Sequence, residues 1–228
     1  MAGNQNINIH FSPEFVQLGI KSIAYALLYN INNQIPLPPQ LTDLIQITQK
    51  QALACTDIEK HPVINGYREM IKNQRRSLKK FPPSAQALLN IIHHSQSFPY
   101  INPVVDIYNV TTVETMLSIG AHDLDKIDLD IYFRLSEGEE KFCPIGGSEK
   151  TTQKGDYVYA DKHNILAWLD TRDSEKVKIS PQTTDIILFI QGNLYTSLEY
   201  RLHALETLCS RITHYCGGNA QIHSILVG

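Results

Sequence analysis

The chain has 228 residues, of which 43% are hydrophobic and 19% charged, enough apolar material for one sizeable core or two small ones. Its formal net charge of −3 argues against a protein that coats nucleic acid non-specifically, and we expect no DNA partner. The longest apolar stretch is far shorter than the roughly 20 residues of a membrane-spanning helix. The N-terminus is polar and lacks the order of a secretory signal. We therefore expect a cytoplasmic protein with no membrane association, forming a single domain over residues 1–228.

The four cysteines form no Cys-x-x-Cys pair, so they indicate neither a disulfide framework nor a structural zinc site. We expect buried thiols, with Cys209 and Cys216 on the apolar face of one helix. His93 and His94 are adjacent on a predicted helix and therefore project about 100° apart, which is unsuitable for one metal ion. We expect no metal and no cofactor.

Basic residues are concentrated between Lys60 and Lys80, where seven cations stand against Glu69 alone. Such a patch on an acidic body can meet a phosphate backbone at one face. The alternative is an ordinary solvated helix surface. The candidate RNA-binding residues are Arg68, Lys72, Arg75, Arg76, Lys79 and Lys80.

The first 83 residues predict a strand and helices. Ser12 followed by Pro13 predicts the capped start of a short helix. Residues 23–31 alternate between large apolar and smaller side chains, which is typical of a strand. Helical patterns then cover residues 41–55, 63–74 and 84–94, the last with Ser84 as the N-cap.

The second half of the chain changes in character. Asn102 before Pro103 predicts a helix that extends to residue 116 or 117. Strand patterns follow at 129–135, 156–160, 165–169 and 185–190, and then a helix at 195–215 and a strand at 221–227. Helices followed mostly by strands favour an α+β fold with an N-terminal helical layer.

Several short motifs lie in order between Ser84 and Gly192. The segment Ile101-Asn-Pro-Val-Val-Asp-Ile-Tyr-Asn109 is followed by Gly120-Ala-His-Asp-Leu-Asp-Lys-Ile127, by Glu137-Gly-Glu139 and by Tyr157-Val-Tyr-Ala-Asp161. This series resembles the B3/B4 domain of the phenylalanyl-tRNA synthetase β subunit, in its freestanding single-domain form. The resemblance implies a helical layer packed on a mixed, barrel-like β core, flanked by residues 1–83 and by the helix and strand of 193–228.

In the synthetase, this domain hydrolyses tyrosine mistakenly attached to the tRNA for phenylalanine. The resemblance therefore implies a tRNA or aminoacyl-tRNA binding module. If the chain is an enzyme, the resemblance implies a hydrolase that serves translation quality control by deacylating misacylated tRNA in trans through a positioned water. No Gly-x-Ser-x-Gly elbow is present, so nucleophilic catalysis has little support, and we assign no catalytic residue.

The expected pocket departs from the family pattern. The family's threonine is Tyr108 here, beside a retained Asn109; its histidine aligns with Gly120; and its last-strand glutamate aligns with Phe189 or Gln191. An apolar pocket discriminates poorly between amino acids that differ by a hydroxyl, so these polar groups matter. The changes leave a second function open, a non-catalytic binder of a small amino-acid-like or nucleoside-like ligand.

The candidate substrate-binding residues are Tyr108, Asn109, Gly120, His122, Asp123, Trp168, Arg172 and Asp173. His122 either positions a water or amine, or is a partly buried loop histidine. Trp168 either stacks on an aromatic ligand or fills the core. Arg172 either binds a phosphate or carboxylate, or pairs with Asp173.

Overall fold

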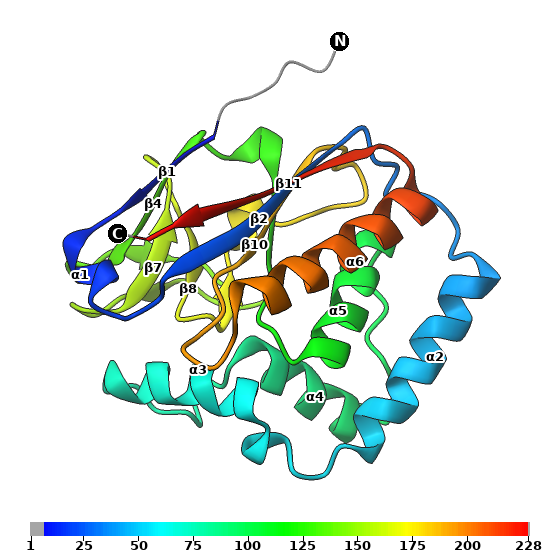
Figure 1. The fold of residues 1–228 in the computed structure, drawn as a ribbon, viewed down its shortest axis with the longest axis horizontal. Coiled ribbons are helices and arrows are strands. Elements are labelled where there is room, and N and C mark those ends of the chain that lie inside the picture. Colours follow the sequence, from blue (N-terminus) through cyan, green and yellow to red (C-terminus); the bar gives the residue numbers. More distant parts are fainter. Residues whose placement is uncertain (1–6, 228) are drawn as a thin grey trace.

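A computed structural model describes residues 7–227, with most helices on one side of the molecule and most strands on the other (Figure 1). The helices are α1 (Pro13–Val16), α2 (Pro39–Ala54), α3 (Pro62–Asn73), α4 (Ser84–Ser95), α5 (Pro103–Thr115) and α6 (Leu198–Cys216). The strands are β1 (Asn8–Phe11), β2 (Ser22–Tyr29), β3 (Gly120–Asp123), β4 (Asp130–Leu135), β5 (Lys141–Phe142), β6 (Lys150–Thr151), β7 (Tyr157–Ala160), β8 (Ile165–Trp168), β9 (Arg172–Asp173), β10 (Ile186–Ile190) and β11 (Asn219–Leu226). The predicted α+β class is confirmed.

The described strands form two main sheets and a small hairpin. The five-stranded sheet has the order β1-β4-β7-β8-β9, the four-stranded sheet has the order β11-β2-β10-β3, and β5 pairs with β6. The β1–β4 pair is parallel, whereas the other strand pairs of residues 7–227 are antiparallel, so the β structure is mixed. Neither main sheet closes on itself, so the core is not a closed barrel.

Strand β10 shows why the four-stranded sheet is the middle layer. Ile186, Leu188 and Ile190 pack in the cluster that contains α2, α4, α5 and α6. The alternate residues Ile187 and Phe189 pack against the five-stranded sheet. Successive strand side chains point to opposite faces, so a strand between two layers is apolar throughout. This is the physical reason for the unbroken apolar run.

The helix termini follow the predicted caps in two cases. The side chain of Ser12 accepts a hydrogen bond from the Phe15 N–H, and that of Asn102 accepts one from the Val105 N–H. The predicted Ser84 cap is wrong, because Pro83 holds the N-cap position and Ser84 is the first helical residue. Its N–H instead donates to the carbonyl oxygen of Asp170 at 3.0 Å. This bond ties the start of α4 to the five-stranded sheet.

Five of the described strands were not predicted from the sequence, namely β1, β3 and the two-residue strands β5, β6 and β9. Strand β1 precedes the first predicted helix, and β3 occupies a segment expected to be a loop. In β3, His122 lies opposite Ile187 of β10, and all four residues of the strand are buried. The polar residues of β3 have partners inside the molecule, so its pattern does not show the apolar alternation of an ordinary strand.

The described cysteines are free thiols. Burial raises the pKa of Cys209 to about 12 and that of Cys216 to about 11, as expected for core thiols of α6. Cys55 and Cys143 are half-buried rather than buried, which corrects the expectation for these two.

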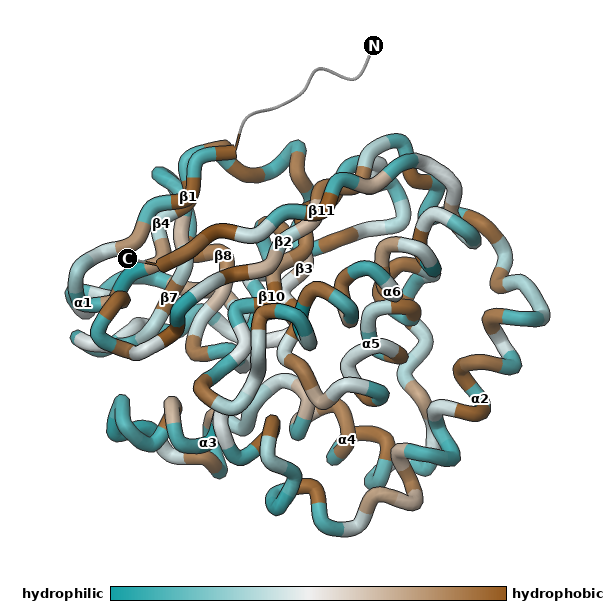
Figure 2. The backbone as a smooth tube through the Cα atoms, viewed as in Figure 1, coloured by the Kyte–Doolittle hydropathy of each residue, from teal (hydrophilic) through white to brown (hydrophobic). Residues whose placement is uncertain are grey.

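The outermost helix, α2, alternates between hydrophobic and hydrophilic residues (Figure 2), and its inner side buries Leu41, Ile45 and Ala52. No helix within residues 7–227 is long and apolar enough to cross a membrane. Residues 1–6, on which the expected lack of a secretory signal rests, lie outside the described part.

Candidate functional site

A cavity of about 280 Å³, here called the main cavity, opens where α4 and α5 meet β3 and the β8–β9 turn. Side chains of α4 and of the segment before α5 form its apolar wall, and β3, β7 and the β8–β9 turn add polar groups. Five of the eight predicted substrate-binding residues line it together, namely Tyr108, Asn109, Gly120, Arg172 and Asp173. His122, Asp123 and Trp168 do not line it.

His122 is completely buried behind Tyr159, a cavity-lining residue of β7. Its Nε2 atom lies 2.7 Å from the Tyr159 hydroxyl oxygen. Burial lowers the pKa of His122 to about 3, so the imidazole is neutral at ordinary pH. The partly buried loop histidine of the sequence prediction is therefore a fully buried strand histidine, and it reaches the cavity only through Tyr159.

The unpaired Nδ1 atom of His122 indicates which tautomer is favoured. A buried N–H without a partner is rarer than an unpaired acceptor in folded proteins. The proton is therefore best placed on Nε2, where it donates to the Tyr159 oxygen. This arrangement leaves the Tyr159 O–H free to donate elsewhere.

Asp123 lies at the end of β3 remote from the main cavity and is used by the fold. Its carboxylate accepts hydrogen bonds from the Thr183 hydroxyl at 2.7 Å and from the Asp125 N–H at 3.2 Å, and pairs with Lys126 at 2.6 Å. Asp125 is exposed to solvent. One aspartate therefore caps the backbone and the other faces water.

Trp168 belongs to the core. Its ring packs edge-on against Phe81 and Phe142, and the Arg76 guanidinium lies over it at 5.6 Å. Trp168 is only 3% exposed. It fills the core and offers no face to a ligand in the main cavity, whereas its neighbour Ala167 lines that cavity.

The turn between β8 and β9 supplies a cavity residue that was not predicted, Asp170. Leu169 and Asp170 have φ values of 59° and 50°, and the Thr171 N–H donates to the Trp168 carbonyl at 3.1 Å. Positive φ at both central residues is the geometry of a type I′ turn, in which aspartate is tolerated better than leucine. The turn-forming Asp170-Thr171 pair between two apolar segments was the available sequence signal.

Asp170 and Asp173 both line the main cavity. Burial, together with the charge on Asp173, raises the pKa of Asp170 to about 8. Burial likewise raises the pKa of Asp173 to about 7, although the Ala121 N–H donates to its carboxylate at 3.3 Å. The nearby phenols of Tyr108 and Tyr159 also have raised pKa values, chiefly through burial, so they remain protonated hydrogen-bond donors.

Arg172 is exposed at the cavity, and its guanidinium forms no ion pair or hydrogen bond with another residue of the described chain. The alternative from the sequence, an ion pair between Arg172 and Asp173, is therefore not formed. A free guanidinium at the cavity is available to a phosphate or carboxylate.

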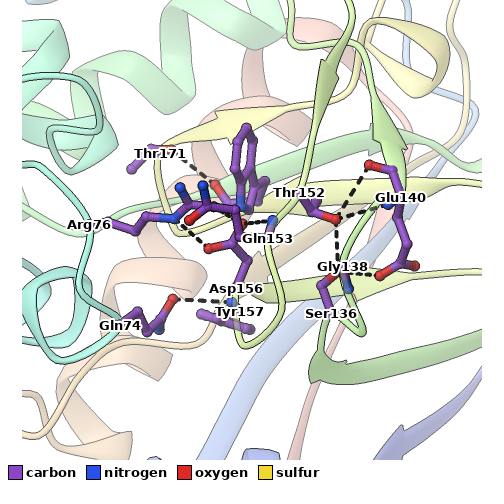
Figure 3. A network of polar contacts seen from close by, with 11 residues as sticks. Gln74, Arg76, Ser136, Gly138, Glu140, Thr152, Gln153, Asp156, Tyr157 and Thr171 are labelled. Carbon is purple, nitrogen blue, oxygen red and sulfur yellow. Dashed lines mark hydrogen bonds and ion pairs between the residues drawn. The ribbon is translucent and has the colours of Figure 1, made fainter.

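Three of the basic residues between Lys60 and Lys80 are engaged by acids. Lys60 pairs with Asp57, and Arg68 pairs with Glu59 and also donates to Gln86. Arg76 makes a two-point contact with buried Asp156, with Nε 2.6 Å from Oδ1 (Figure 3). Arg76 was predicted to bind RNA, but it is 11% exposed and holds the α3–α4 connection onto the sheet.

The other cations of the segment, namely Lys72, Arg75, Lys79 and Lys80, are exposed, and no ion pair joins them to the described residues. We call these four the free basic group. Lys80 precedes Ser84 by four residues, and four residues of chain span at most about 14 Å. Because Ser84 lines the main cavity, the free basic group ends close to it.

Asp106 supports the entrance of the cavity. Its carboxylate accepts a hydrogen bond from the Ile101 N–H at 2.9 Å, and Ile101 lines the cavity. Burial raises the pKa of Asp106 to about 6. In residues 7–227 there is no group of three or more His, Cys, Asp or Glu side chains that could hold a metal ion.

Comparison with known proteins supplies the family. The B3/4 domain family matches residues 66–216, about two thirds of the chain. The chain belongs to the B3/4 domain family. The match includes α4, α5, β3 and the β8–β9 turn, and hence every residue that lines the main cavity.

Two curated relatives are phenylalanine–tRNA ligase beta subunits. The protein from Haemophilus ducreyi is 33% identical over 141 residues, which is 52% of this chain and 18% of the relative. The protein from Shewanella oneidensis is 40% identical over 88 residues, 39% of this chain and 11% of the relative. The chain thus spans less than a fifth of the length of these relatives.

A solved structure supports the fold. An N-terminal fragment of the phenylalanyl-tRNA synthetase β subunit from Pyrococcus horikoshii superposes with a TM-score of 0.52, covering 96% of this chain and 52% of the fragment. The sequence identity is 16%. The predicted resemblance to the B3/B4 domain is therefore confirmed, and the chain is related at the family level to a synthetase module.

Proposed function

We propose that the chain binds an aminoacyl-tRNA, receives its aminoacyl end in the main cavity and hydrolyses the ester of a misacylated tRNA in trans. The observation that carries the proposal is the position of α4. Its residues Ser84, Ala87, Leu88 and Ile91 line the cavity, and the free basic group immediately precedes it. The family relationship to phenylalanine–tRNA ligase beta subunits supports the same assignment.

The free basic group suits the RNA backbone. Its four exposed cations are not neutralised by the described residues, so each is available to a phosphate. Arg172 adds a fifth free cation directly at the cavity. A 3′ strand that passes Lys79 and Lys80 would reach the cavity within the span of a few nucleotides.

Hydrolysis requires attack of water on the ester carbonyl carbon and cleavage of the bond to the ribose oxygen, which takes up a proton and yields free amino acid and tRNA. Tyr108 and Asn109 are half-buried in the cavity wall on successive positions of α5. A protonated phenol and an amide can hold a water and donate to the carbonyl oxygen. His122, the residue considered from the sequence for positioning a water, and Asp123, another predicted substrate-binding residue, lie outside the cavity.

Two measurements test the proposal. Binding of tRNA should weaken with salt, and replacing Lys72, Arg75, Lys79 and Lys80 by alanine should reduce the log–log salt slope by about 0.7 to 0.9 for each phosphate that the protein no longer neutralises. Lys60→Ala is the matched control because Lys60 is already paired with Asp57. Incubation with a panel of aminoacyl-tRNAs should release one amino acid or a few.

The same measurements distinguish the proposed function from the alternative, a non-catalytic binder of a small ligand. A protein that shows neither salt-dependent tRNA binding nor deacylation is not the proposed module. If free amino acids or nucleosides then raise the melting temperature, the chain is a binder of small ligands.

A further inference from the structure

The main cavity changes in character with depth. Three isoleucines that line it are well exposed, Ile91 at 50%, Ile101 at 63% and Ile145 at 44%, and they mark its opening. Tyr159 and Gln191 line it at 2% and 3% exposure and mark its floor. A ligand therefore passes an apolar rim before it meets polar groups.

Two carboxyl groups lie at the polar end. A Cβ placed on Gly120 would lie 3.7 Å from a carboxyl oxygen of Asp173 and 2.1 Å from the Tyr159 hydroxyl oxygen. Asp170 is fixed through its carbonyl oxygen, which accepts from the Ser84 N–H at 3.0 Å and from the Ser118 hydroxyl at 3.4 Å. Both aspartates line the cavity and are half-buried.

No cation of the described chain neutralises these two carboxyls. Neither Asp170 nor Asp173 takes part in an ion pair within residues 7–227, and Arg172, between them in sequence, is exposed and unpaired. The Asp170 carboxyl also accepts no hydrogen bond from a described residue. Both aspartates are half-buried, and ionising them without a cation is unfavourable, so the arrangement is complementary to a ligand that brings a positive charge.

The orientation of an aminoacyl-tRNA decides which part of it reaches the floor. The ester joins the amino acid to a nucleic acid far larger than a cavity of about 280 Å³, so the ester end must stay at the opening. The side chain is then the part that passes the three isoleucines. Its stem meets apolar carbon and its tip meets Asp170 and Asp173.

Resting on the function proposed above, we propose that the aminoacyl group accepted by the main cavity has an aliphatic side chain that ends in an ammonium, as in lysine or ornithine. The apolar rim binds the methylene stem. Asp170 and Asp173 bind the terminal ammonium, and Tyr159 completes the floor.

The test compares L-lysine methyl ester with L-norleucine methyl ester, which has the same α-ammonium and lacks only the terminal amine. Calorimetry with the full chain should show that the lysine ester binds at least about tenfold more tightly, because a charge-assisted hydrogen bond contributes about 1.5 to 3 kcal/mol. Asp170→Asn and Asp173→Asn should each abolish this preference. Asp125→Asn, which removes an exposed carboxylate outside the cavity, should leave it unchanged, and thermal melts establish that each variant is folded.

The outcomes distinguish this inference from the proposed deacylase function on which it rests. Equal binding of the two esters, or an unchanged preference in both folded cavity variants, overturns the inference. Deacylation of tRNAs charged only with uncharged amino acids overturns it also, while leaving the deacylase function intact. Preference for the lysine ester without deacylation of lysyl-tRNA supports the side-chain assignment and removes the hydrolytic function.

Discussion

Gly120 lies directly against the hydroxyl of Tyr159: a Cβ on residue 120 would be 2.1 Å from the Tyr159 oxygen. The same hydroxyl is 2.7 Å from His122, two residues further along β3 and therefore on the same face of the strand. The glycine makes room for the phenol, and the phenol covers the imidazole. This relationship explains why the histidine of β3 is a buried supporting group and does not line the main cavity.

Replacing Gly120 by alanine should destabilise the protein by about 2 to 4 kcal/mol. The new methyl group must displace the Tyr159 phenol, which overpacks the core and leaves buried His122 without its partner. Urea denaturation of the wild type and of Gly120→Ala measures the change in the free energy of unfolding.

The matched control is the double variant Gly120→Ala with Tyr159→Phe. Tyr159→Phe alone should cost about 1 to 3 kcal/mol, because it leaves both ring nitrogens of His122 unpaired. Removal of the oxygen also removes the clash, so the double variant should lose less than the sum of the two single changes. Strictly additive losses would contradict direct contact between these residues.

Arg75 and Arg76 are neighbours in sequence with different roles. Arg76→Ala should cost about 3 to 5 kcal/mol, since it leaves the buried Asp156 carboxylate without a cation. Arg75→Ala should change stability by less than about 0.5 kcal/mol, because Arg75 is exposed and unpaired in the described chain. Thermal or urea unfolding of the two variants gives the comparison.

The same pair tests the RNA surface. Arg75→Ala, remaining fully folded, should weaken tRNA binding at low salt and reduce the salt slope by about one phosphate contact. Normal tRNA affinity in Arg75→Ala would remove this residue from the interface.

Arg172→Ala should weaken aminoacyl-tRNA binding with little effect on stability, since the guanidinium forms no internal ion pair in residues 7–227. Lys162→Ala, which removes another exposed cation not at the cavity, is the matched control. Filter-binding curves at two salt concentrations should separate the two variants; equal affinities would place Arg172 outside the RNA interface.

Local chemistry accounts for what could be predicted from the sequence. Ser12 and Asn102 cap helices through bonds to residues three positions away, and the apolar run of β10 reflects burial on both faces, so these features are visible in short windows. Other features depend on distant partners. Arg76 is buried by Asp156, which is 80 positions away, and β3 is a strand because it pairs with β10.

The main cavity is similarly non-local. Tyr108, Asn109 and Gly120 were predicted from motifs, but Tyr159 and Asp170 belong to other segments and join the site only after the sheets pack. Asp170 was missed because its place at the cavity depends on a β8–β9 turn in which Leu169, like Asp170, has a positive φ. A leucine in that conformation is not expected from local propensity.

The aspartate pair of the main cavity should make the protein less stable as pH rises. The unfolded carboxyls lose their protons near pH 4, whereas Asp173 and Asp170 in the folded protein retain theirs until about pH 7 and about pH 8. Between these limits the unfolded state binds fewer protons, so the free energy of unfolding decreases with pH and levels off above about pH 8. The facing phenols of Tyr108 and Tyr159 stay neutral throughout this range.

Asp170→Asn removes one of the two titrating groups and should therefore reduce this pH-dependent loss of stability. The measurement is urea denaturation at pH 5, 6.5 and 8 for the wild type, Asp170→Asn and the exposed-site control Asp125→Asn. The difference in the free energy of unfolding between wild type and Asp170→Asn should grow with pH, because only the wild type has the Asp170 carboxyl. Contributions from histidines and other carboxylates are common to both proteins and cancel. If the two proteins show parallel pH profiles, Asp170 does not retain its proton in the folded state, and its carboxylate is already ionised at neutral pH without a ligand.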